Sequence, residues 1–106
     1  MGFYMIRASY TQQGIQGVLK EGGTARARAV EAVVGSAGGK VVCQFWAFGA
    51  DDFVAIAELP DNVAAASVAA TVAATGAVAI STTVLLTADE VDAAVRLHPS
   101  YRAPGA

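Results

Sequence analysis

The chain has 106 residues, of which 55% are hydrophobic, and a formal net charge of −2. This length fits one domain that buries a core without disulfides or metal, and the charge predicts no general affinity for nucleic acid or an anionic membrane. Cys43 is the only cysteine, which excludes an intrachain disulfide, and the N-terminus lacks a signal-peptide pattern, so we expect a cytoplasmic protein.

The first third of the chain predicts a strand followed by a broken helix. Apolar alternation indicates a strand over residues 3–10, and Thr11 is suited to cap the helix that follows. Gly22-Gly23 interrupts this helix, Thr24 restarts it, and the periodic apolar pattern ends near Gly35.

The stretch from Val41 to Leu59 predicts a β-hairpin. Two apolar runs, VVCQFWAF and FVAIAEL, are joined by Gly49-Ala50-Asp51-Asp52. Pro60-Asp61 begins a second helix that ends at Gly76, and residues 77–86 form a fourth strand. Residues 62–87 carry no charge, but they are mostly weakly hydrophobic, which argues against a membrane span.

A short helix is expected at the C-terminus. Its start is the capping box Thr87-x-x-Glu90, and Pro99 after His98 ends it. We therefore expect a single domain over residues 1–98 and a flexible tail over residues 99–106.

The element order βαββαβ predicts an α+β fold of the ferredoxin-like type, a four-stranded antiparallel sheet with both helices on one face. Strand alternation assigns a set of apolar residues to the face under the helices. This set comprises Tyr4, Ile6, Ala8, Val41, Cys43, Phe45, Phe53, Ala55, Ala57, Val78, Ile80 and Val84.

The opposite face is predicted to be too apolar for water, so we expect a second copy to cover it in a sheet-to-sheet oligomer, at least a dimer. Its predicted residues are Met5, Arg7, Ser9, Gln44, Trp46, Phe48, Val54, Ile56, Glu58, Ser81, Thr83 and Leu85.

Arg7 and Glu58 are the candidate catalytic pair, because neighbouring central strands would place both on that face. Two interpretations are open: an ion pair that fixes the register between subunits, or a pocket where Arg7 holds an anion or carbonyl and Glu58 moves a proton. His98, the only histidine, is a third catalytic candidate, or else caps a helix C-terminus as an imidazolium.

A ligand pocket is expected on the same sheet face or at a subunit boundary, lined by Trp46, Gln44, Ser81 and Thr83. Small side chains along the Ala-rich second helix predict close packing on the sheet, which would leave little space for a pocket there.

No complete cofactor motif is present, so we expect no bound cofactor. Gly49 is expected to supply an unusual backbone angle, and Asp52 to accept backbone hydrogen bonds in the hairpin turn. Asp51 and Asp52 are adjacent carboxylates and candidate ligands of a divalent cation. The sequence offers no further ligands near them, so we expect no bound metal.

Several segments carry a family resemblance: Tyr10-Thr11-Gln12-Gln13-Gly14, Gly39-Lys40-Val41, Phe45-Trp46-x-Phe48-Gly49-x-x-Asp52-Phe53-Val54-Ala55-Ile56 and Leu59-Pro60-Asp61. The chain resembles the GYD family, although Asp51 stands where the name-giving motif has tyrosine. The resemblance implies a protomer of the dimeric α/β-barrel type. For function it leaves three expectations: a homo-oligomeric small-molecule-binding protein, a cofactor-free isomerase, lyase or oxygenase acting on a small hydrophobic or aromatic substrate, or an assembly module without ligand.

Overall fold

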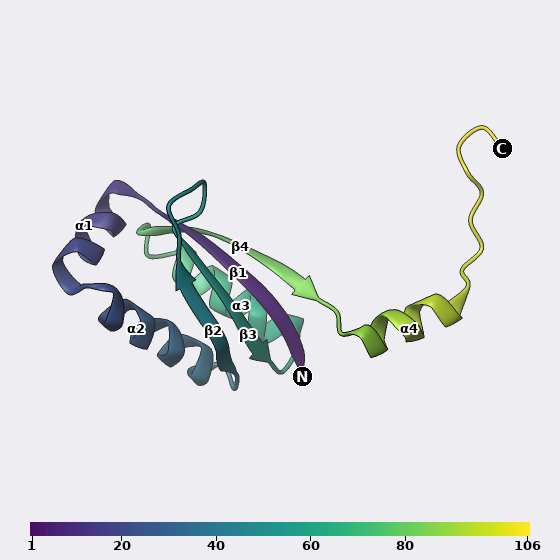
Figure 1. Ribbon diagram of the computed structural model, residues 1–106, viewed down its shortest axis with the longest axis horizontal. Coiled ribbons are helices and arrows are strands. Elements are labelled where there is room, and N and C mark those ends of the chain that lie inside the picture. The colour runs from purple at the N-terminus through teal and green to yellow at the C-terminus, as the bar shows by residue number, and fades with distance from the viewer.

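The computed structural model describes all 106 residues, and its elements follow the predicted order (Figure 1). The elements are β1 (Gly2–Tyr10), α1 (Gln12–Glu21), α2 (Gly23–Ser36), β2 (Lys40–Trp46), β3 (Phe53–Leu59), α3 (Asn62–Ala73), β4 (Val78–Leu85) and α4 (Ala88–Leu97). The break in the first helix is confirmed, since α1 and α2 are separated only by Gly22 at a φ of 86°.

The four strands form one open sheet in the order β2-β3-β1-β4, and every neighbouring pair is antiparallel. Helices α1, α2 and α3 lie on one face of this sheet (Figure 1). The predicted α+β, ferredoxin-like fold is therefore confirmed. We call the face without helices the open face.

The helix starts agree with the capping residues in the sequence. The Thr11 hydroxyl accepts a hydrogen bond from the Gly14 N–H at 3.2 Å, and the Asp61 carboxylate accepts one from the Ala64 N–H at 2.9 Å. The predicted capping box is also present at α4, where Thr87 and Glu90 bond to each other's backbone N–H groups at 3.2 and 2.9 Å.

The core lies between the two central strands and the helices above them. Strands β1 and β3 contribute most of it, because each has neighbours on both sides and helices over one face. Its buried residues are Tyr4, Ile6, Ala8, Phe53, Ala55, Ala57 and Leu59 from these strands, with Val34, Ala65, Val68 and Val78.

A β-bulge at Val42 overturns part of the predicted face assignment. Val41 pairs with Ala57, but Cys43 pairs with the next residue on β3, Ile56, so Val42 is an extra residue in β2. Because side chains alternate along a strand, every residue after the bulge exchanges faces.

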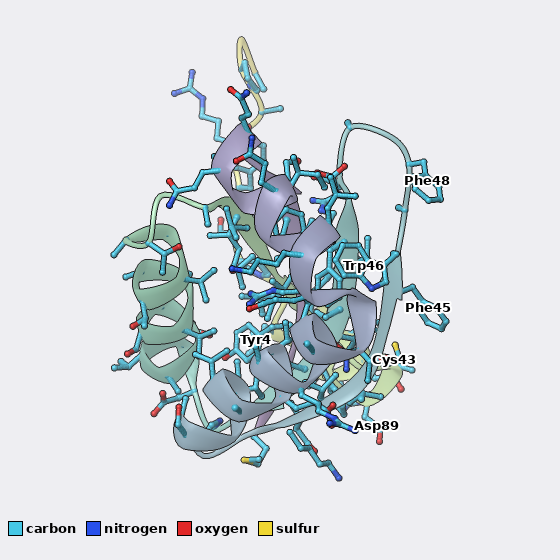
Figure 2. All side chains as sticks on the ribbon, turned by 90° about the vertical axis from the view of Figure 1, so that its left-hand side faces the viewer. Tyr4, Cys43, Phe45, Trp46, Phe48 and Asp89 are labelled. Carbon is cyan, nitrogen blue, oxygen red and sulfur yellow. The ribbon has the colours of Figure 1, made fainter.

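Cys43 and Phe45 were therefore wrongly assigned to the core, and Gln44 and Trp46 wrongly to the open face. Cys43 is half-buried on the open face, Phe45 is 68% exposed there, and Trp46 packs on the helix side (Figure 2). Val84 does share the face of Tyr4, but it lies near the end of the edge strand β4 and is 56% exposed.

The C-terminal segment leaves the body of the molecule after β4. Helix α4 contains no buried residue, and together with the chain that follows it stands away from the sheet and the other helices (Figure 1). We call residues 86–106 the C-terminal arm. None of the four helices combines the length and apolarity needed to cross a bilayer.

Candidate functional site

The structure brings together three of the predicted site residues on the open face. Arg7 on β1 lies opposite Ser81 on β4, and its Nη2 donates a hydrogen bond to the Thr83 Oγ1 at 3.4 Å. Arg7, Ser81 and Thr83 are all exposed in the protomer. This cluster is polar and lies within a face that is otherwise largely apolar.

Glu58 does not join that cluster, so the predicted ion pair with Arg7 is wrong. Arg7 pairs in register with Val54, four residues before Glu58 on β3, which separates them by roughly 13 Å along the strand. The Glu58 carboxylate instead lies 3.7 Å from the Nζ of Lys40 on β2. Arg7 and Glu58 share a face but do not form one site.

His98 lies at the C-terminal end of α4 in the left-handed conformation, with a φ of 45°, and is exposed. Its predicted position at the helix end is confirmed. The arm carries it away from the sheet (Figure 1), so the structure does not bring His98 to Arg7 or Glu58.

The β2–β3 loop is fastened to the end of β1 by Asp52. Its carboxylate accepts the Tyr10 N–H at 2.8 Å, and its own N–H donates to the Ala8 carbonyl at 2.8 Å. Asp52 therefore accepts a backbone hydrogen bond, but from β1 rather than from within the hairpin turn as predicted. Asp51 accepts only a long hydrogen bond of 3.4 Å from the Ser9 hydroxyl. Gly49 does not adopt a positive φ, so its predicted special backbone angle is wrong.

A cavity lies on the other face of the sheet, where close packing of α3 was expected to leave little space for a pocket. It is a cleft of about 470 Å³ between α1 and α2 on one side and α3 on the other, floored by β1, β3 and β4. Its lining residues are Ile6, Ala8, Tyr10, Gln13, Gly14, Gly17, Glu21, Arg26, Ala29, Val30, Val33, Val34, Phe53, Val68, Thr71, Val72, Thr75, Ala77, Val78 and Ile80.

An aromatic cluster supports one end of this cleft. The Tyr10 ring stacks on Trp46 at a centroid distance of 5.6 Å and an interplanar angle of 17°, and Trp46 meets Phe53 edge to face at 5.5 Å. Tyr10 and Phe53 line the cleft, and Trp46 lies behind them. The bulge that turned Trp46 to this side therefore also fixes the cleft wall.

The charged residues of the cleft are an ion pair at the join of α1 and α2. Arg26 Nη1 lies 3.5 Å from Glu21 Oε2, and their side chains are 30% and 49% exposed. Because the pair is partly solvated, either partner can turn toward a polar group of a ligand at little electrostatic cost.

Two glycines of α1 determine how much space remains in the cleft beside this helix. A Cβ on Gly14 would collide with the carbonyl oxygen of Ala77, so the helix approaches the start of β4 as closely as only glycine permits. A Cβ on Gly17 would meet nothing within 4 Å and would enter the cleft. Sequence reasoning missed the cleft, and the Gly14-x-x-Gly17 spacing on one helix face is the signal from which it could have been inferred.

A model of the GYD domain matches residues 4–95 of this chain. No curated protein and no solved structure matches it. The matched range begins within β1 and ends within α4, so it contains all of the sheet except the first two residues of β1, the helices that line the cleft and the hairpin loop fastened by Asp52. The chain therefore belongs to the GYD domain family.

Proposed function

We propose that this protein is a homo-oligomeric small-molecule-binding protein whose ligand occupies the cleft between the helices and the sheet. The observation that carries the proposal is the cleft itself. Its volume of about 470 Å³ falls within the 300–1,000 Å³ range typical of ligand pockets, and 13 of its 20 lining residues are hydrophobic.

The lining favours a ligand with an apolar body and one polar end. Aliphatic side chains from α2 and α3 line the cleft, where burial of apolar ligand surface provides the affinity. Polar groups are supplied by Gln13, Thr71 and Thr75 and by the Glu21–Arg26 pair. A few such groups in an apolar pocket orient a ligand rather than provide most of its binding energy.

Binding is favoured over catalysis because the three residues proposed as catalytic from the sequence, Arg7, Glu58 and His98, do not line the cleft. Homo-oligomerisation is supported by the apolar content of the open face. There Met5, Val54 and Ile56 are only half-buried in the protomer, and Phe45 projects from it. A second copy on that face would leave the cleft on the outer side of each protomer.

The test is a titration with decanoate, which has an apolar chain and one carboxylate, followed by fluorescence and calorimetry. Trp46 is the only tryptophan and stacks on the cleft residue Tyr10, so its emission reports on the occupied cleft. Gly17→Leu should place a side chain in the cleft and weaken binding by about tenfold or more, which is about 1.4 kcal/mol.

Gly35→Leu is the matched control, because Gly35 is a helical glycine with open space around it outside the cleft. Both substitutions improve helix propensity, so a folding effect would appear in both. Equal decanoate affinity in the two variants, or no saturable binding to the native chain, would contradict the proposed cleft.

A further inference from the structure

Helix α4 of the C-terminal arm is capped at both ends but buries none of its residues against the rest of the protomer. Thr87 and Glu90 form the capping box of α4, and His98 closes it in the left-handed conformation. None of its ten residues is buried. Isolated helices shorter than about 12–15 residues are marginally stable in water, because their few hydrogen bonds do not offset the free-energy cost of helix nucleation. A helix of this length therefore needs a surface to pack against.

One side of α4 is apolar and exposed, and is therefore suited to pack against such a surface. Val91 and Val95 follow each other at the i, i+4 spacing and are 46% and 64% exposed. Asp89 and Arg96 lie on the other side of the helix, and Asp92 lies at the border between the two sides.

The chain leaves the open face for the arm through two apolar residues. Leu85, the last residue of β4, pairs with Phe3 on that face, and the next residue, Leu86, is 60% exposed. Apolar side chains thus extend from the open face as far as Leu86, and the polar first turn of α4 separates them from Val91.

The dimensions of the protomer show how much surface lacks a partner. Its radius of gyration is 16.8 Å, against about 13 Å for a compact domain of 106 residues. Its accessible surface is 6982 Å², about 1,500 Å² more than expected for a compact monomer of 10.7 kDa. A stable interface removes about 800 Å² from each partner, so this excess is enough for one.

We propose that the arm of each copy packs α4, through Val91 and Val95, onto the open face of a second copy, which returns the same contact. This inference rests on the second copy of the proposed function but not on the ligand. A second copy is the fitting occupant because it presents an open face with the same apolar character as the arm. A two-fold exchange also pairs both arms and leaves no further arm unpaired.

Sedimentation velocity over a dilution series tests the exchange on the full chain. The double variant Val91→Asp, Val95→Asp should raise the dimer dissociation constant by about tenfold or more, because it places two carboxylates in the contact. Ala93→Asp is the matched control on the opposite side of the helix and should leave the constant within about twofold of the native value.

Hydrogen exchange of the α4 amides provides the second measurement. Amides of an arm packed on a second copy should gain protection as the protein concentration rises through the dissociation constant. Protection of α4 in a chain that remains monomeric would mean that the arm folds back on its own sheet, and would overturn the proposal.

Failure of the exchange is distinguishable from failure of the proposed function. A dimer that the double variant and the control leave equally tight would overturn the role of the arm and keep the oligomer. A monomeric native chain would overturn both the homo-oligomer of the proposed function and the contact made by the arm. Neither result affects the cleft, which the comparison of Gly17→Leu with Gly35→Leu tests separately.

Discussion

Two glycines three residues apart in α1 have opposite surroundings, and this predicts opposite effects of the same substitution. Gly14→Ala places its methyl group against the Ala77 carbonyl, so we expect a loss of about 1–3 kcal/mol of unfolding free energy. Gly17→Ala enters open space and should stabilise by about 0.5–1 kcal/mol through helix propensity. Urea unfolding of the two variants measures the difference, and effects of the same sign would contradict the close contact at Ala77.

Asp52 and Asp51 are adjacent carboxylates with unequal roles. Asp52→Ala removes the acceptor of the Tyr10 N–H and leaves this half-buried donor without its partner, so we expect a loss of about 1–3 kcal/mol in urea unfolding. Asp51→Ala removes only a long hydrogen bond to Ser9 and should change stability by less than about 0.5 kcal/mol. Equal losses would mean that the Asp52 carboxylate does not fasten the loop more strongly than that of Asp51 does.

At the scale of the element, α4 should respond to acid through its capping box. The Thr87 backbone N–H donates to the Glu90 carboxylate, and this bond, with one from the Thr87 side chain, lowers the pKa of Glu90 below its ordinary 4.5. A lowered pKa in the folded state means that the ionised form stabilises the helix. The stabilisation is complete above pH 4.5 and is lost as the pH falls through the lowered value.

Backbone chemical shifts of α4 followed by NMR should therefore show helix loss below pH 4.5 in the native chain. Glu90→Gln lacks the titrating carboxylate and should show no transition in that range. A transition that persists in Glu90→Gln would assign the acid response to another group.

Element ends were predictable from the sequence because their signals are local. Thr11, Asp61 and Thr87 each cap the helix that follows them, and Gly22 breaks the first helix where the glycine pair predicted it. The faces of β2 were not predictable, because the alternation in VVCQFW is apolar on both sides of the strand. Gln44 is the only polar residue in this run and the bulge places it on the helix side, so the pattern gives no sign of where an extra residue has been inserted.

At the scale of the whole molecule, the open face should control self-association. Phe45→Glu puts a charge on this face at a position already 68% exposed, so the protomer should fold normally and associate more weakly by about tenfold. Leu19→Glu is the control, since Leu19 is 82% exposed on α1 and lies outside the cleft. Light scattering across a concentration series measures the difference, and equal association of both variants would contradict an interface at this face.

The overall fold followed from the sequence because the order of strands and helices leaves few antiparallel arrangements. The candidate site did not, because its position depends on tertiary distances. Arg7 and Glu58 share a face but are separated by the β1–β3 register. The cleft exists because α1 and α2 on one side and α3 on the other leave a gap over the sheet. Neither the register nor the helix spacing can be read from side-chain alternation.

The extra residue at Val42 has a consequence for comparison within the family. A relative that lacks it would keep the same strand order and the same core on β1 and β3, but would place the counterpart of Phe45 inside and that of Trp46 outside. Two such proteins could share nearly every residue of this strand and still present different surfaces to a partner and different walls to a ligand. One inserted residue at the edge of the sheet is thus enough to change specificity while the fold stays the same.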